Sequence, residues 1–266
     1  MKINPHLLLP ALTATAVGAA AQVAVIAPPD SVRYIDPLRE YIVVGLDTIH
    51  LSFLHRPAEV PSGSLTEKDF EEVAAELGVE VAAVKAVVDI EAGKEHKGFW
   101  DDGKPLINFD LSVYRRMAAR RKINLDKYTT SHPLIFARPD TKRFGSRQAA
   151  VQARLDQALS IDSVSAIEGT FWGMFQIGGF NWRQSGTDSP AHFVELMSRS
   201  ERDQLELFAA FITRTGLLPA LKEKNWSAFA RGYNGPSYAA RGYHTRLAAA
   251  YARHKAEENA RKKNDE

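Results

Sequence analysis

The chain has 266 residues, of which 45% are hydrophobic, so it is long and apolar enough for one sizeable globular core with an appendage, or for two small domains. This composition excludes disorder over the full length. The formal net charge is only +2, and the lack of cysteine excludes disulfides, thiolate metal sites and thiol nucleophiles.

An uncharged run, LLLPALTATAVGAAAQVAVIA, covers residues 7–27 and follows Lys2. Its length and small residues are compatible with a secretory signal or with a weak Ala-rich membrane anchor. Pro10 and the many Ala and Thr residues are unfavourable for insertion, so a buried helix or strand pair that docks to another surface is a third interpretation. Membrane association through residues 7–27 is therefore one hypothesis.

A β-rich stretch, YIVVGLDTIHLSFLH, starts at Tyr41 and predicts one or two strands. The segment PAEVPSGS follows, and its Pro and Gly content predicts a linker. The predicted organisation is therefore an N-terminal module over 1–63, a second domain over 64–256 and a charged tail over 257–266. The tail is expected to be an exposed, fraying helix end.

Patterns of helical period dominate the second domain. Thr66 and Asp69 resemble a capping box, and an apolar stripe follows until Gly78. The hairpin signal is WDDGKPLINF, which has an Asp-Gly turn between apolar flanks. Further helices are expected over about 80–92, 113–122, 147–160, 190–198, 201–215 and from residue 238 into the tail. The predicted fold class is mainly α with a small β-hairpin.

The helix over 80–92 has a carboxylate where an apolar residue is expected, because Glu91 continues the stripe of Val84, Val87 and Val88. Burial and the negative end of the helix dipole both disfavour the ionised form, so the pKa of Glu91 should be raised. A protonated carboxylic acid is the general acid of a glycosidase. An ion pair or a packing compromise is the alternative. Asp89 falls on the other side of the helix and is expected to be solvated.

A segment rich in Gly and aromatic residues, GTFWGMFQIGGFN, runs from Gly169 to Asn181. Gly destabilises a helix by about 0.5–1 kcal/mol relative to Ala, so this is no ordinary amphipathic helix. It can line a cleft in which glycines let a polymer approach the backbone, aromatic faces stack on sugars and Gln176 supplies hydrogen bonds. A tightly packed aromatic turn is the alternative. In FARGYNGPSY, Tyr233 and Asn234 precede a Gly-Pro turn and can bond a backbone carbonyl or a ligand.

In this order and spacing, the three motifs resemble the N-acetylmuramidase family of phage endolysins, which belongs to the lysozyme-like superfamily and is related to goose-type lysozyme and lytic transglycosylases. The similarity covers 65–254. It implies that the second domain, which follows the short N-terminal module, is a two-lobed lysozyme-like domain. It also implies that this domain cuts peptidoglycan between N-acetylmuramic acid and N-acetylglucosamine, with Glu91 as general acid. The substrate-binding residues that it implies are Trp172, Gly173, Phe175, Gln176, Asn181, Tyr233 and Asn234.

The chain departs from the family pattern in Phe109-Asp110-Leu111-Ser112, where members commonly have F-E-R-H. Hydrolysis requires a second carboxylate or an ordered water. Asp102 and Asp110 are the second catalytic candidates, and Asp101 and Glu168 are further possibilities. A turn and a helix cap are the structural alternatives for Asp102 and Asp110.

The segment 111–154 is strongly basic, which indicates an anionic partner or a solvated basic face. Its basic residues are Arg115, Arg116, Arg120, Arg121, Lys122, Lys127, Arg138, Lys142, Arg143, Arg147 and Arg154, against Asp126 and Asp140. No nucleic-acid-binding signature accompanies them, so nucleic acid is not a predicted partner. The histidines show no metal-site spacing, and we predict no metal or other cofactor.

The implied substrate lies in the periplasm and cell wall, so the protein must be exported through its N-terminal segment or delivered by a holin or a secretion machine. A secreted antibacterial effector, with an unknown delivery or immunity partner, is one such setting. Two rival functions stay open. One is a lytic transglycosylase that leaves 1,6-anhydro ends, and the other is a non-catalytic wall-binding or structural module of a phage or secretion particle.

Overall fold

The computed structural model describes residues 64–92 and 97–265, together with four short strands within 23–50. The chain divides into two compact units, 1–50 and 51–266. The predicted linker up to residue 63 and most of the apolar run 7–27 lie outside the described residues. In the part of the chain that is described, no helix combines the length and hydropathy that crossing a bilayer requires.

The N-terminal unit contains a four-stranded antiparallel sheet in the order β1-β2-β3-β4. Its strands are β1 (Val23–Ile26), β2 (Val32–Asp36), β3 (Tyr41–Val44) and β4 (Asp47–His50). The strands predicted from residue 41 are confirmed as β3 and β4, which pair with Ile42 opposite Ile49. Strand β1 falls within the apolar run.

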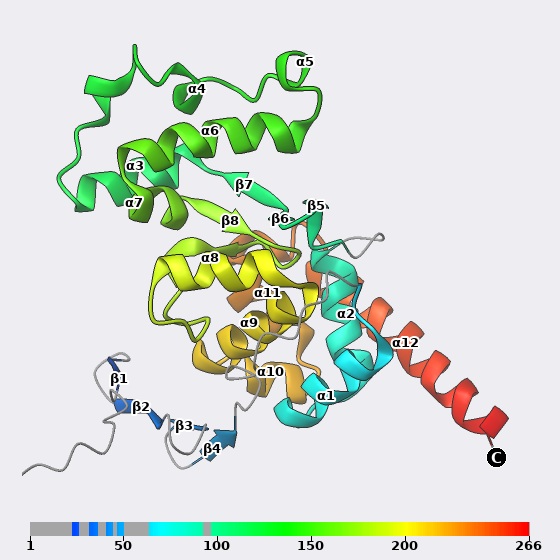
Figure 1. Cartoon of the computed structure of the whole chain (residues 1–266). Helices are drawn as coiled ribbons and strands as arrows, with labels where there is room; N and C mark the ends of the chain where they lie inside the picture. The colour runs from blue at the N-terminus through cyan, green and yellow to red at the C-terminus, as the bar shows by residue number, and fades with distance from the viewer. Residues whose placement is uncertain are drawn as a thin grey trace, which may run out of the picture. The chain divides into compact units, whose positions relative to one another are not determined.

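The second unit is mainly helical and has two lobes, as predicted (Figure 1). One lobe, here the α9 lobe, comprises α1 (Glu67–Leu77), α2 (Val81–Glu91), α8 (Pro190–Arg199), α9 (Glu201–Arg214), α10 (Leu218–Lys222), α11 (Trp226–Asn234), η4 (Pro236–Tyr238) and α12 (Tyr243–Asp265). The other, the α6 lobe, comprises α3 (Leu111–Arg120), η2 (Leu125–Tyr128), α4 (Pro133–Phe136), α5 (Thr141–Phe144), α6 (Arg147–Ile161) and α7 (Ser163–Glu168). Helix α9 forms the centre of the first lobe, because nearly all of its residues are buried.

Small antiparallel sheets connect the two lobes. The predicted hairpin is confirmed as β5 (Phe99–Asp101) paired with β6 (Lys104–Pro105), with Gly103 in the left-handed region at φ +64°. The next strand, β7 (Ile107–Phe109), pairs with β8 (Thr170–Trp172), and β8 pairs with β9 (Ile177–Gly178). This pairing places the Gly- and aromatic-rich segment beside the hairpin that follows Glu91. Its last residues form η3 (Gly179–Asn181).

Helix boundaries in the α9 lobe follow local chemistry. The Thr66 side chain caps α1 and Asp69 completes the capping box, while Gly78 ends the helix with a left-handed φ of +62°. Both features confirm the sequence prediction.

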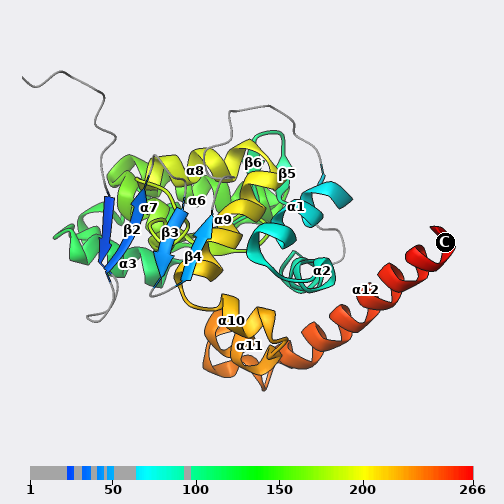
Figure 2. The ribbon, with the colours of Figure 1, turned by 90° about the horizontal axis from the view of Figure 1, so that it is seen from below.

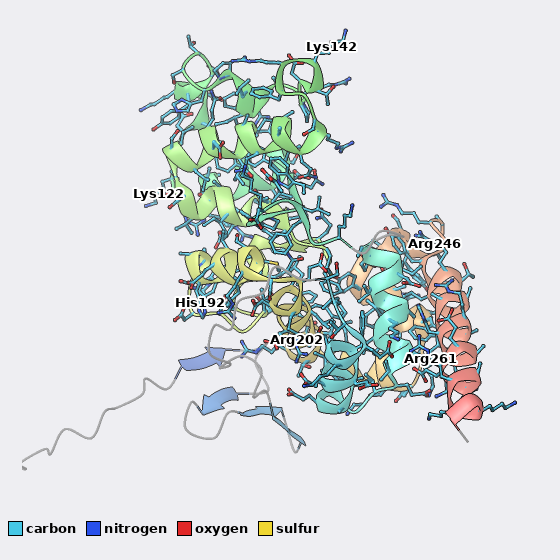
Figure 3. The ribbon with its side chains drawn as sticks, turned by 45° about the vertical axis from the view of Figure 1, so that its right-hand side comes forward. Lys122, Lys142, His192, Arg202, Arg246 and Arg261 are labelled. Carbon is cyan, nitrogen blue, oxygen red and sulfur yellow. The ribbon has the colours of Figure 1, made fainter. Side chains whose placement is uncertain are left out.

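Helix α12, the long red helix that runs toward the C-terminus in Figure 2, packs along α2. Figure 3 shows the two helices side by side. Asp89 of α2 forms an ion pair with Arg253, and its Oδ2 lies 2.7 Å from Nε2 of His254. Only 12% of the Asp89 side chain is exposed. The prediction that Asp89 is solvated is therefore wrong, because a helix far away in the sequence covers that face. Helix α12 continues to Asp265, and Arg261 near its end lies 3.2 Å from Glu67.

Candidate active site

Glu91 is the last residue of α2, and it lines a cleft of about 290 Å³ where the two lobes meet. The cleft walls come from the end of α2, the segment 106–108, the start of α6 and the turn between β8 and β9. Among the described residues that line this cleft, Glu91 is the single carboxylate. The acid predicted from the sequence thus lies in a groove that also contains Gln176.

The electrostatic environment favours the protonated form of Glu91. Burial raises its pKa above the ordinary value, because the α2 stripe that it extends is packed away from water. Two weaker effects lower the pKa: the Asn234 amide donates from Nδ2 to Glu91 Oε1 at 3.0 Å, and the positive charge of Arg246 acts from α12. Figure 3 labels Arg246 at the end of α12 that lies nearest the α6 lobe. The predicted direction of the pKa shift agrees with this structure.

Asn234 reaches Glu91 because its neighbour fixes the end of α11. The Tyr233 hydroxyl donates to the Phe175 carbonyl at 2.7 Å, and the Tyr233 ring stacks on Phe229 with centroids 5.8 Å apart. Burial raises the pKa of Tyr233 well above its usual value, so this donor stays protonated. Of the two roles expected at this corner, Tyr233 has that of bonding a backbone carbonyl, whereas Asn234 bonds the carboxyl group of Glu91, a partner that neither expected role included.

Two aromatic residues predicted to bind substrate are core residues in the structure. Trp172 is 4% exposed, and its Nε1 donates to the Ile167 carbonyl at 3.0 Å. Phe175 is 1% exposed and stacks on Phe208 at a centroid distance of 4.4 Å. Neither ring has a face left for a sugar, so the prediction of stacking by these rings requires correction.

A second cleft, of about 480 Å³, meets the first at Gln176, which lines both. This second cleft is lined by Asn181 and Tyr233, two of the residues that the family resemblance implies for substrate binding. The half-buried rings of Phe171 and Phe180 line it as well. Sequence reasoning missed these two rings. The sequence signal that could have identified Phe171 is the alternation of side chains along a β-strand. Successive residues of β8 point to opposite faces, so Phe171 faces the cleft when Trp172 faces the core.

The glycines of this segment allow the protein to pack against itself. A Cβ on Gly173 would lie 2.7 Å from Oε1 of Gln204, and one on Gly178 would lie 2.5 Å from the Phe180 ring. At Gly179 the Cβ would lie 2.0 Å from the Ile167 carbonyl oxygen. Gly173 and Gly178 do line the clefts, but the interpretation that they open the backbone to a polymer is wrong. The alternative interpretation from the sequence, a tightly packed aromatic turn, describes these glycine positions better.

Of the remaining acidic candidates, Asp110 and Glu168 have structural partners. Asp110 caps α3 by accepting from the backbone N–H groups of Ser112 and Val113 at 2.8 and 2.9 Å. Asp102 is exposed in the hairpin turn. Glu168 is buried, lies 2.8 Å from Arg121 and accepts from Trp182. The described residues lining the two clefts include none of these acids, so the structure does not bring Asp102 or Asp110 into the cleft of Glu91.

Sequence reasoning also missed a buried amide that holds the site together. Gln204 of α9 accepts from the Met174 N–H at 2.8 Å and donates to the carbonyls of Met197 and Gly98 at 2.8 and 3.3 Å. It therefore ties the aromatic segment to the start of the hairpin. The signal was present, because Gln204 interrupts the packed stripe of α9 as Glu91 interrupts that of α2.

A sequence model of the N-acetylmuramidase family matches residues 80–255, a range that contains Glu91, both clefts and the Tyr233-Asn234 corner. The chain belongs to the N-acetylmuramidase family. The crystal structure of the Burkholderia AP3 phage endolysin is similar to this family member, with 35% sequence identity and a TM-score of 0.63 over 77% of this chain and 76% of that chain. No curated protein matches the chain. As a muramidase-family protein with a lysozyme-like fold, it is a glycoside hydrolase that acts on the peptidoglycan of the cell wall.

Proposed function

We propose that the protein cleaves the bond between N-acetylmuramic acid and N-acetylglucosamine in the glycan strand, with Glu91 as general acid. The observation that carries the proposal is this single carboxylate, half-buried at the wall of the cleft, where desolvation raises its pKa. A carboxyl group that keeps its proton near neutral pH can donate it to the leaving sugar oxygen. A non-catalytic wall-binding module has no need for such an acid.

In this proposal Asn234 acts on Glu91 both before and after Glu91 transfers its proton. It donates to Oε1, so the acid proton resides on Oε2, which faces the substrate in this proposal. After the transfer, Glu91 is a half-buried anion. The Asn234 amide and the Arg246 charge stabilise that anion, since both lower the pKa of Glu91.

The glycan is proposed to lie along the two clefts that meet at Gln176. Gln176 and Asn181 offer amides, Tyr233 and Gly173 form part of the walls, and the rings of Phe171 and Phe180 are available for sugar stacking. The adjoining volumes and the shared Gln176 support one extended groove, as a polymeric substrate requires.

The lack of a second carboxylate among the described cleft residues leaves two chemistries. In hydrolysis, a water bound in the cleft attacks the sugar after protonation by Glu91. In a lytic transglycosylase, the 6-hydroxyl of the same muramic acid attacks and gives a 1,6-anhydro end. A single acid suffices for the second reaction, so this observation keeps it as the alternative.

Mass analysis of the fragments released from purified sacculi tests the proposal. Hydrolysis gives reducing ends, which borohydride converts to muramitol, and anhydro fragments are lighter by one water. Muramitol ends support the proposal, whereas anhydro ends would establish the transglycosylase. Glucosaminitol ends would show that the other glycosidic bond is cut.

The route of the protein to the wall stays a prediction. Export or anchoring through residues 7–27 and delivery by a holin or secretion machine are the alternatives. N-terminal sequencing of protein recovered from the periplasm tests for a cleaved signal, because an intact Met1 excludes signal cleavage.

A further inference from the structure

The cleft contains a cation that has no assigned role. Arg147, the first residue of α6, lines the same cleft as Glu91, and its side chain is exposed. Among the described residues it has no hydrogen-bond or ion-pair partner. The neighbouring Gln148 is occupied, because both ends of its amide bond the backbone of Ile107, at 3.1 and 3.3 Å. Arg147 is therefore available to a ligand in the cleft.

Two more cations precede Arg147 at the junction of α5 and α6. Lys142 and Arg143 are exposed, and Figure 3 shows Lys142 extending from this end of the α6 lobe. The nearby acid, Asp140, uses its carboxylate to cap α5 by accepting from the Arg143 N–H at 3.0 Å. The corner 142–147 thus presents positive charge beside the cleft, and its counter-charge must come from elsewhere.

The chemistry of the substrate supplies that counter-charge. The sugars of a peptide-substituted glycan strand are uncharged, because the lactyl carboxyl of muramic acid is tied up in an amide with the stem peptide. The negative charges lie on the carboxylates of that peptide. A guanidinium binds a carboxylate through two parallel N–H donors, a geometry that lysine cannot reproduce.

We infer that Arg147 binds a carboxylate of the stem peptide on a muramic acid held in the cleft, so that the protein selects peptide-substituted glycan through this charge. The inference rests on the proposed function, since it places the glycan in the cleft of Glu91. Arg147 is a specificity-determining residue in this account. It should affect KM for charged substrate and leave kcat almost unchanged, because it does not contact the bond that is cleaved.

The test compares two soluble substrates of equal length. One is a set of glycan strands with native stem peptides, and the other is the same material after carbodiimide amidation of the peptide carboxylates. The wild-type protein should have a KM about 5-fold lower for the native strands, which corresponds to about 1 kcal/mol, at the upper end for an exposed ion pair. Arg147→Ala should abolish this ratio and Arg147→Lys should keep part of it.

Controls separate the possible failures. Lys127→Ala removes an exposed cation of η2 that does not line either cleft, and it should keep the wild-type ratio. A wild-type ratio near one, or an unchanged ratio in Arg147→Ala, overturns the inference while fragment release still supports the proposed function. Peptide-free strands, which carry the lactyl carboxylate, serve as a third substrate, and an effect of Arg147→Ala on these strands alone also overturns the inference. If the wild-type protein cleaves neither substrate, the proposed function itself fails.

Discussion

Gly179 is the position where one added methyl group should damage the fold of the site most. It begins η3 at the second cleft, and a Cβ there would lie 2.0 Å from the Ile167 carbonyl oxygen and 3.1 Å from Trp172 Nε1. The indole nitrogen and that oxygen form a 3.0 Å hydrogen bond. Because the obstructing oxygen belongs to the backbone of α7, it cannot rotate aside, so α7 or η3 must shift.

The magnitude follows from these contacts. Overpacking a dense interior costs about 1–3 kcal/mol, and loss of the Trp172 hydrogen bond adds about 0.5–1.5 kcal/mol. We therefore expect Gly179→Ala to lower the free energy of unfolding by about 2–4 kcal/mol. For a unit of this size, that is a fall in Tm of about 5–15 °C.

Thermal unfolding followed by far-UV circular dichroism measures the change, and Gly216→Ala is the matched control. Gly216 has a left-handed φ of +75° but no atom within 4 Å of an added Cβ. The control should therefore lose only the conformational term of about 1–2 kcal/mol. Equal losses of Tm at both positions, or no loss in Gly179→Ala, would refute the account of the motif glycines as close-packing positions.

Three further predictions concern charge. Glu91→Gln should raise the Tm at pH 7 by about 2–4 °C, because replacing a functional acid whose ionised form is disfavoured by burial commonly stabilises a protein. The pKa of Glu91 is raised in the folded state, so the wild-type protein loses stability as pH rises through that pKa. The gain in Tm should therefore vanish below the ordinary pKa of 4.5. Ion pairs with Lys224 and Lys255 lower the pKa of Glu80 to about 2, so the wild-type protein should lose stability as pH falls from 4.5 toward 2. Urea unfolding over this pH range should show a smaller loss of the free energy of unfolding for Glu80→Gln. Asn234→Ala removes a donor that lowers the pKa of Glu91, so the alkaline limb of the kcat profile should move to higher pH while kcat falls, and an unmoved limb contradicts the assignment.

Local signals were enough for much of the fold. The capping box at Thr66, the Gly78 stop and the Asp-Gly hairpin turn each act within a few residues, and each is confirmed. The short helices α4 and α5 were missed because four residues are too few to show a helical period.

Parts of the site depend on contacts that no local pattern contains. Glu91 was found because a carboxylate interrupts an apolar stripe. Asp89 was misjudged because its partner Arg253 lies 164 residues further along the chain. The prediction that Trp172 binds substrate was wrong for another reason. The family resemblance identifies the motif, but the alternation of side chains along the strand decides which rings face the cleft.

The most direct test of the central claim is the release of soluble fragments from purified sacculi by the Glu91→Gln protein, after its fold has been verified by circular dichroism. Glutamine retains the shape of the side chain and cannot donate the acid proton. We predict a fall in the initial rate of at least about 100-fold, the size of a general acid's contribution, with binding to sacculi retained. A folded Glu91→Gln protein that releases fragments at the wild-type rate would contradict the claim.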